Sequence, residues 1–278
     1  MILPGFLSEM RRWLCLALFS VALSCQGLQL VPFIATNGLF RIRFQSLNNT
    51  SYVLLRGTNP TNINDYADEI FGNGGIREMS DPSPFVEPHT FYRVRETDIK
   101  LLINEVDYDQ STAPDNASFI EIYNNSSVDL VLANFAVVLV NGNGNVEYAR
   151  YNLSDAGGSH LFSGSYLVIA NSTVTVPPST RTISVFGDFL QNGPDAIALV
   201  NLSTKTIVDA LSYEGSITNA LITGFPGTFN LVEGTATPLA DDSSSARSLI
   251  RKPNGTDTDN AAADWAATSS PSPGSANP

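Results

Sequence analysis

The stretch LLINEVDYDQSTAPDNASFIEIYN, residues 101–124, decides the fold that this sequence predicts. Its two ends, LLINEVD (101–107) and SFIEIYN (118–124), are short runs rich in Leu, Ile and Val, and a polar loop joins them. Apolar runs of this length between turn-forming residues are typical of paired β-strands. The same pattern continues as far as Ile250, so we expect a β-rich domain after residue 97.

Six later runs repeat the pattern, and no amphipathic helix of useful length interrupts them. Asn141-Gly142-Asn143-Gly144 is a hairpin signal, because Asn and Gly tolerate consecutive positive φ angles. FAVVLV and YLVIA are apolar on both faces, so we expect those strands to be covered on both sides. Together these runs predict an all-β sandwich. They are FAVVLVN (135–141), VEYARY (146–151), SYLVIA (165–170), AIALVN (196–201), TIVDALSY (206–213) and ARSLIR (246–251).

A smaller β module is predicted at residues 38–97. LFRIRFQ (39–45), SYVLLR (51–56) and FYRVR (91–95) read as strands, and Phe40, Ile42 and Phe44 alternate with arginines, as in a strand with one buried face. The middle, residues 59–88, is rich in Gly, Pro, Asn and Asp, with one helical turn expected at 65–71. The larger domain then takes residues 98–266. Residues 267–278 are Ser, Pro, Gly, Ala, Asn and Thr, which predicts a disordered tail.

The first 25 residues have the parts of a secretory signal peptide. Arg11 and Arg12 precede an apolar run at 13–23, and small residues before Cys25 suit a signal peptidase. The alternative is lipid modification of Cys25, although Ala22 stands where such signals usually carry Leu. The apolar run is about half the roughly 20 residues of a membrane span, so no transmembrane helix is expected. We therefore expect a secreted, extracellular or cell-surface protein.

Charge and cysteine content narrow the function classes. The net charge is −12, and residues 101–270 carry 6 Lys/Arg against 18 Asp/Glu. An acidic surface repels phosphate backbones and anionic lipids, so nucleic-acid binding is disfavoured. Both cysteines, Cys15 and Cys25, fall within the predicted signal. The mature body therefore has no disulfide, cysteine nucleophile or cysteine zinc site after residue 25.

Eight segments in order resemble an extracellular lamin-tail domain. The resemblance implies an immunoglobulin-like sandwich, typical of secreted or surface proteins of bacteria. The preceding module, with SYVLLRG and FYRV, resembles a small β module repeated in secreted bacterial proteins. The eight segments are INEVD (103–107), FIEIYN (119–124), FAVVLVNGNGNVEYARYNL (135–153), YLVIA (166–170), QNGPDAIALV (191–200), IVDALSYEG (207–215), RSLIRKPNGTDTDNAAADW (247–265) and SPSPGSAN (270–277).

The carboxylates of the 101–124 stretch are the leading candidate site. If the two strands pair, Asp107, Asp109 and Asp115 lie near one loop, where oxygen ligands could hold Ca²⁺. The spacing is not that of an EF-hand, which needs glycine at the sixth position and Glu at the twelfth. The competing interpretation is that these acids are solvated and accept hydrogen bonds from turn N–H groups.

Other ionisable residues are weaker candidates. Asp188 and Asp195 lie in a turn-rich loop and offer a second metal hypothesis. Glu121 and Asp209 lie inside strands, where paired buried carboxylates could do acid–base work, but we expect them to face solvent or accept backbone hydrogen bonds at a sheet edge. His89 and His160 are the only imidazoles, and no nucleophile-elbow or nucleotide-binding motif accompanies them.

These observations favour a non-enzymatic protein that works by binding or support: adhesion, scaffolding or ligand presentation. No cofactor is expected apart from the Ca²⁺ hypothesis, and the expected partner is an extracellular protein or polysaccharide. The alternative is an accessory or catalytic part of an extracellular metal-dependent hydrolase acting on phosphoesters.

Overall fold

A computed structural model describes residues 28–36, 38–83, 89–111, 114–243 and 247–278. The predicted signal peptide at 1–25, with both cysteines, lies outside these residues. The chain divides into two compact units, Met1–Asp98 and Ile99–Pro278, called unit 1 and unit 2 below.

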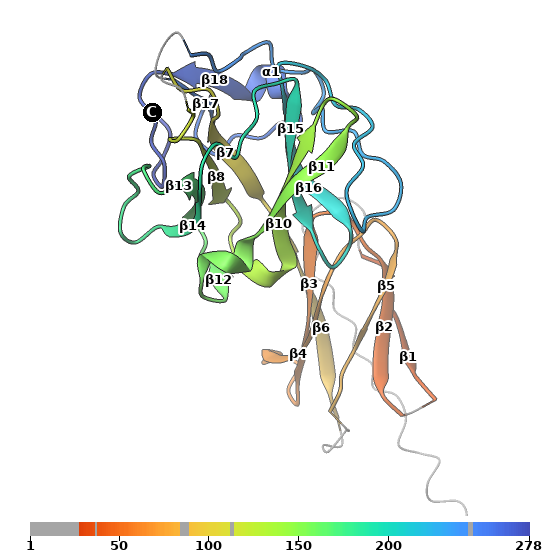
Figure 1. Ribbon diagram of the computed structural model, residues 1–278. Helices are drawn as coiled ribbons and strands as arrows, with labels where there is room; N and C mark the ends of the chain where they lie inside the picture. The colour runs from red at the N-terminus through yellow and green to blue at the C-terminus, as the bar shows by residue number, and fades with distance from the viewer. Residues whose placement is uncertain (1–27, 37, 84–88, 112–113, 244–246) are drawn as a thin grey trace, which may run out of the picture. The chain divides into compact units, whose positions relative to one another are not determined.

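Unit 1 consists of two three-stranded antiparallel sheets, with strand orders β1-β2-β5 and β4-β3-β6 (Figure 1). The inward side chains of β2 and β3 pack between the sheets, where Phe40, Phe44 and Tyr52 are buried. The alternation of apolar residues and arginines along β2 produces this packing, because the apolar side chains point inward and the arginines point outward. The strands are β1 (Val31–Ile34), β2 (Phe40–Gln45), β3 (Thr50–Gly57), β4 (Asp65–Phe71), β5 (Ile76–Ser80) and β6 (Phe91–Asp98).

The helical turn expected at residues 65–71 is wrong, because Asp65–Phe71 is strand β4. Pairing with β3 overrides the local helical preference of this segment: Ser51 lies opposite Phe71 and Arg56 opposite Asp65. Ala67 then packs into the core of unit 1.

Unit 2 is a β-sandwich of a six-stranded sheet, order β14-β13-β8-β7-β17-β18, and a four-stranded sheet, order β11-β10-β15-β16. A two-stranded sheet, β12-β9, and three short helices complete it. The strands are β7 (Leu101–Asp107), β8 (Phe119–Asn124), β9 (Leu130–Val131), β10 (Phe135–Asn141), β11 (Val146–Asn152), β12 (His160–Leu161), β13 (Tyr166–Asn171), β14 (Arg181–Val185), β15 (Asp195–Asn201), β16 (Thr206–Tyr213), β17 (Ser248–Arg251) and β18 (Trp265–Thr268). The helices are η1 (Leu132–Asn134), η2 (Leu153–Ala156) and α1 (Ala261–Asp264).

The two opening runs of unit 2 pair as the sequence predicts. β7 and β8 are antiparallel neighbours, with Ile103 opposite Ile122 and a bulge at Asn104. The prediction of an all-β, immunoglobulin-like sandwich is confirmed by this architecture. The described residues contain no helix of the length and hydrophobicity that a membrane span needs.

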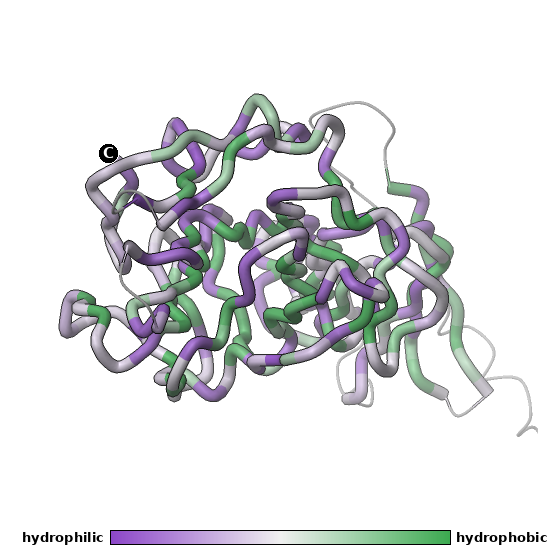
Figure 2. The backbone as a smooth tube through the Cα atoms, turned by 45° about the horizontal axis from the view of Figure 1, so that its top comes forward, coloured by the Kyte–Doolittle hydropathy of each residue, from purple (hydrophilic) through white to green (hydrophobic). Residues whose placement is uncertain are grey.

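The four-stranded sheet is covered on both faces, as its apolar strands predict. On the outer face Val138 and Ala198 pack against a cap, residues 217–231, that contributes Ile217, Ile222 and Leu231. The opposite side chains, such as Leu139 and Leu199, are fully buried as well. In Figure 2 many of the hydrophobic (green) stretches lie in the interior.

The prediction of a disordered tail at 267–278 is wrong. Residues up to Thr268 belong to β18, and the following segment, residues 272–277, hydrogen-bonds to buried polar groups of unit 2. The polar composition predicted disorder, but this segment is held without apolar side chains, because its backbone N–H groups donate to carboxylates of the six-stranded sheet. We call residues 272–277 the C-terminal segment.

Candidate functional site

The loop between β7 and β8 does not assemble the predicted calcium ligands. Among described residues, only one group of three carboxylates has ligand oxygens within 4.8 Å of one another, and it does not include Asp107, Asp109 or Asp115. Each of the three instead accepts a hydrogen bond: Asp107 from Gln110 Nε2, Asp109 from the N–H of Ser243, and Asp115 from the N–H of Gln110. This arrangement matches the turn-capping interpretation, and calcium binding here stays a prediction.

Negative charge nevertheless accumulates around this loop. Burial raises the pKa of Asp107 to about 7, and the nearby Asp241, Glu105 and Asp115 raise it further while Gln110 lowers it. Burial also raises the pKa of the exposed-loop residue Asp188, with repulsion from Asp115 and Asp109 added. The raised pKa of Asp107 favours its protonated form, which weakens it as a cation ligand.

The most concentrated group of ionisable side chains lies elsewhere, around Arg251 at the end of β17. β17 lies between β7 and β18, and Arg251 points from it into the space between the two sheets. The guanidinium is fully buried, with a side-chain exposure of 0%. It lies 5.1 Å from the ring centroid of Trp265, the first residue of β18. A buried guanidinium needs an acceptor for every N–H, because an unpaired buried charge is very costly.

Arg251 makes hydrogen bonds to five segments of unit 2. Nε donates to the carbonyl of Ile103 on β7 at 2.9 Å. Nη2 donates to Asp209 Oδ1 on β16 at 2.6 Å and to Glu233 Oε2, in the loop after β16, at 3.2 Å. Nη1 is shared among the carbonyl of Thr256, Asp257 Oδ1 and Asp264 Oδ2 at 3.1–3.4 Å. The guanidinium therefore joins both sheets and the loops around them.

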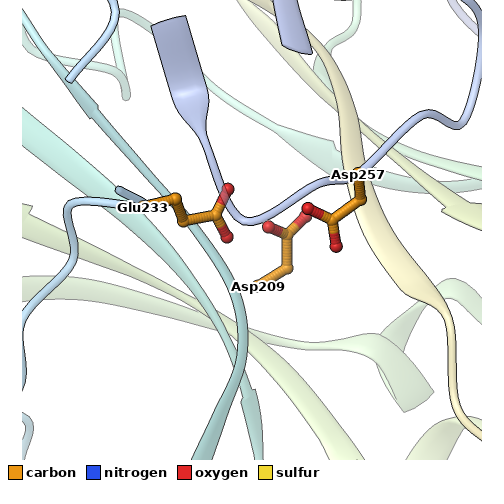
Figure 3. A group of neighbouring side chains, drawn as sticks. All are labelled: Asp209, Glu233 and Asp257. Carbon is orange, nitrogen blue, oxygen red and sulfur yellow. The ribbon is translucent and has the colours of Figure 1, made fainter. Parts of the chain in front are cut away.

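Three of these carboxylates converge on one point (Figure 3). Asp209, Glu233 and Asp257 come from β16, the loop after it and the loop after β17, and their oxygens lie within 4.8 Å of one another. Such a group can hold a metal ion in principle. Here the Arg251 guanidinium contacts all three, at 2.6, 3.2 and 3.3 Å, and so already supplies the cation. A divalent ion would be placed against a fixed positive charge, so these residues do not fit a metal.

The proton balance of the cluster follows from burial. Burial and the adjacent Asp209 raise the pKa of Glu233 to about 10, so Glu233 carries a proton at neutral pH. Burial raises the pKa of Asp209 too, but Arg251 and the hydrogen bond with Glu233 oppose the rise. Asp209 also accepts the N–H of Ile103 at 2.6 Å, which favours its charged form. One proton on Glu233 thus relieves the excess of carboxylates over the single arginine.

This geometry connects segments of the fold, and we call Arg251 with Asp209, Glu233, Asp257 and Asp264 the Arg251 junction. Glycoside-cleaving carboxylate pairs stand roughly 5–9.5 Å apart with the substrate between them. Asp209 and Glu233 instead both accept hydrogen bonds from the same nitrogen, Arg251 Nη2. Asp209 is 2% exposed. Of the two alternatives expected for Asp209 and Glu121, exposure to solvent is wrong, because both are buried. Acceptance of backbone hydrogen bonds is observed for both, and Asp209 lies on the edge strand β16.

A second buried acidic pair lies on the outer face of the six-stranded sheet. Glu105 and Glu121 are directly opposite on β7 and β8, and both are 0% exposed. Glu105 accepts hydrogen bonds from Ser248 Oγ and from the N–H and Oγ of Ser272, and Glu121 accepts from Asn104 Nδ2 and the N–H of Gly274. Burial raises the pKa of Glu121 to about 8 despite these donors. The pair faces the C-terminal segment and no open cleft.

The remaining candidates do not form a catalytic arrangement with these groups. Asp195 is buried, and its Oδ1 accepts the N–H of Gly142 at 2.9 Å, as its turn position predicts. His160 is bonded to the adjacent Ser159 hydroxyl at 2.8 Å. His89 lies in unit 1 and His160 in unit 2.

With this geometry established, the comparisons with known proteins can be placed on it. Residues 96–215 match the family model of the Lamin Tail Domain. A crystal structure of a DUF4876 family protein from Bacteroides thetaiotaomicron VPI-5482 aligns over 82% of this chain and 82% of that chain, at 12% identity and a TM-score of 0.37. No curated protein sequence matches the chain.

The lamin tail domain match ends before the junction is complete. Asp209 lies within residues 96–215, but Glu233, Arg251, Asp257 and Asp264 lie after it. β17 and β18 nevertheless belong to the same six-stranded sheet as β7 and β8. The sandwich that contains the matched residues is therefore completed by residues 216–278, which supply the arginine and three of its four acids.

The sequence did not predict the role of Arg251 at the centre of this cluster. Unit 2 has only four arginines, and Arg251 ends an apolar strand run, Ser248–Arg251, in which all four residues are buried. A lone basic residue in such a run, in an acidic domain with an acid inside another core strand, is a signal for a buried ion pair. Glu233 and Asp257 carry no comparable signal, because they lie in loops, and Asp264 ends the short helix α1.

Proposed function

We propose that the protein is exported and acts outside the cell or on its surface as a non-enzymatic binding or structural module, in adhesion, scaffolding or ligand presentation. The observation that carries the proposal is the Arg251 junction, because Arg251 and Asp209 are buried and the carboxylates around them pair with the guanidinium. Those groups connect segments of the domain, and the arginine already occupies the point on which the carboxylates converge. The lamin tail match supports the same class of protein.

The export half of the proposal is tested by where the chain is found and by its mass. The full chain is produced in a bacterial host, and the medium, the cell-surface and the cytoplasmic fractions are probed. We expect a processed chain outside the cytoplasm, cut before Cys25 or carrying a lipid on Cys25; intact mass separates these two results. An unprocessed chain confined to the cytoplasm would contradict export.

The non-enzymatic half is tested by activity. The purified protein is assayed against generic phosphoester and glycoside substrates with Ca²⁺, with Mg²⁺ and with a chelator. We expect no turnover above buffer. Turnover that the chelator abolishes would replace this proposal with the hydrolase alternative.

The calcium prediction is tested alongside. The melting temperature is followed during a Ca²⁺ titration of the wild type and of Asp109→Asn/Asp115→Asn. A rise in the wild type that the double variant lacks would support calcium at Asp107, Asp109 and Asp115; equal curves would remove it.

A further inference from the structure

An open pocket of about 370 Å³ lies at the β14 edge of the six-stranded sheet, away from the Arg251 junction. Residues of η2, β12, β13 and β14 line it. The volume is within the roughly 300–1,000 Å³ of small-molecule sites. The pocket combines one arginine, two aromatic rings and several hydroxyl groups.

Arg181, the first residue of β14, is the charged residue of the pocket. The other three arginines of unit 2, Arg150, Arg247 and Arg251, each form an ion pair with a carboxylate. Among the described residues no carboxylate pairs with Arg181, whose Nη1 donates to the carbonyl of Gly157 at 2.5 Å. Most of its five donors thus remain for a ligand. A guanidinium left without a carboxylate in a domain with 18 acids against 6 basic residues over 101–270 is a distinctive feature.

The Gly157-Gly158 pair provides the space for this guanidinium. Gly158 has a φ of +71°, and a Cβ at this position would lie 2.2 Å from Arg181 Nη1 and 2.6 Å from Nη2. Any side chain here would push the guanidinium away. The loop after η2 therefore leaves room for the Arg181 guanidinium, and the bond from Nη1 to the Gly157 carbonyl holds one of its nitrogens there.

The rest of the lining suits a ring-shaped ligand with hydroxyl groups. Phe162 is 57% exposed at the pocket, which offers an apolar face on which the C–H side of a sugar ring can rest. Tyr166 is held by stacking on Tyr123, at 4.6 Å between ring centroids. The hydroxyls of Thr180 and Thr182 make only long bonds of 3.4 Å within the domain, which leaves them available to a ligand.

We infer that the Arg181 pocket binds a saccharide unit that carries a carboxylate, as a uronic acid does. The carboxylate pairs with the Arg181 fork, the ring packs on Phe162, and Thr180 and Thr182 bond to ring hydroxyls. This inference rests on the proposed binding role and gives that role a site and a ligand class.

Electrostatics selects the carboxylate over more highly charged groups. The pocket belongs to an acidic chain of net charge −12, with Asp129 bonded to Ser163 beside Phe162 and Asp155 in η2 beside Ala156. The repulsion from these acids is about twice as large for a dianionic phosphate as for a carboxylate, which carries a single charge. The carboxylate also matches the planar guanidinium fork.

The test is a titration of the full chain, followed by calorimetry or NMR, with an oligosaccharide that contains one uronic acid. The matched ligand is the same oligosaccharide with its carboxylate reduced to an alcohol. We expect the acidic ligand to bind about tenfold or more tightly than the reduced one, and Arg181→Gln to abolish that difference. Phe162→Ala should lower the affinity for both ligands. Arg247→Gln, which removes a surface arginine paired with Asp242, is the control and should change neither.

Three results obtained with a bound saccharide would overturn the inference. They are equal binding of the two oligosaccharides, unchanged preference in Arg181→Gln, and displacement of the acidic ligand by inorganic sulfate at similar concentration, which would mark a simple anion site. Absence of any saccharide binding would also end it, while leaving the export and activity results of the proposed function standing on their own measurements.

Discussion

Arg251 is a buried charge on which the stability of unit 2 is expected to depend. Its guanidinium is fully buried and holds Asp209 at 2.6 Å. Removing one member of a buried ion pair typically costs 3–5 kcal/mol, since the other charge stays buried without compensation. We therefore expect Arg251→Met to lower the free energy of unfolding of unit 2 by about 3–5 kcal/mol in denaturant titrations.

Two matched variants give this prediction its control. Arg247→Met removes an arginine whose ion pair with Asp242 is partly exposed, at 32% and 44%, and should cost under about 1 kcal/mol. Arg251→Met/Asp209→Asn should cost less than the sum of its single variants, because the second change removes the stranded charge. Equal losses for Arg247→Met and Arg251→Met, or strict additivity, would show that Arg251 is not the junction.

Glu121 makes the stability of unit 2 depend on pH. Its pKa is about 8 in the folded protein against an ordinary value of 4.5, so the folded state keeps a proton that the unfolded state has lost. This contribution to stability is fully present below about pH 4.5 and is lost as the pH rises through 8. Glu105, directly opposite, has a pKa raised by burial in the same direction.

The measurement is the stability difference between wild type and Glu121→Gln across pH 5–9. Glutamine does not ionise, so the free energy of unfolding of the variant, relative to that of the wild type, should rise by about 2–4 kcal/mol from pH 5 to pH 9. Ser154→Ala, a change in η2 at a side chain that does not ionise, should show a difference that is flat with pH. A flat difference for Glu121→Gln as well would mean that Glu121 is already ionised at pH 5.

At the scale of elements, the C-terminal segment is the part that composition concealed. Ser272 lies between Pro271 and Pro273 and donates its N–H to both oxygens of Glu105 at 3.1 Å. Ser272→Pro keeps an extended backbone but removes the N–H and Oγ donors from a buried carboxyl group. We expect a loss of about 1–3 kcal/mol in the unfolding free energy of unit 2. Ser270→Pro, whose N–H bonds only to Thr268 Oγ1 at an exposed position, should cost clearly less; the reverse order would contradict the assignment.

Strand positions were predictable from the sequence, whereas the partners of polar groups were not. LLINEVD, FAVVLVN and TIVDALSY became β7, β10 and β16 because period and turn residues are local signals. β14, an edge strand with exposed Ser184, and the two-residue β9 carry too little pattern. Glu233 and the C-terminal segment find their partners 18 and more residues away in sequence, and no local rule encodes such contacts.

At the scale of the whole molecule, each unit contains its own buried core. Leu54 is fully buried between the sheets of unit 1, and Leu199 is fully buried in unit 2. Units with separate cores tend to unfold as separate cooperative transitions. We expect calorimetry of the full chain to show two transitions. Leu54→Ala should lower the midpoint of one and Leu199→Ala that of the other, each at a cost of about 2–5 kcal/mol.

The assignment of the two transitions follows from the variants already described. Arg251→Met and Ser272→Pro must shift the same midpoint as Leu199→Ala, because the junction and the C-terminal segment stabilise only unit 2. A single transition that every variant lowers would mean that the units unfold cooperatively. In that case the stability of unit 2 would depend on unit 1, and unit 1 would act as part of its fold rather than as a separate module.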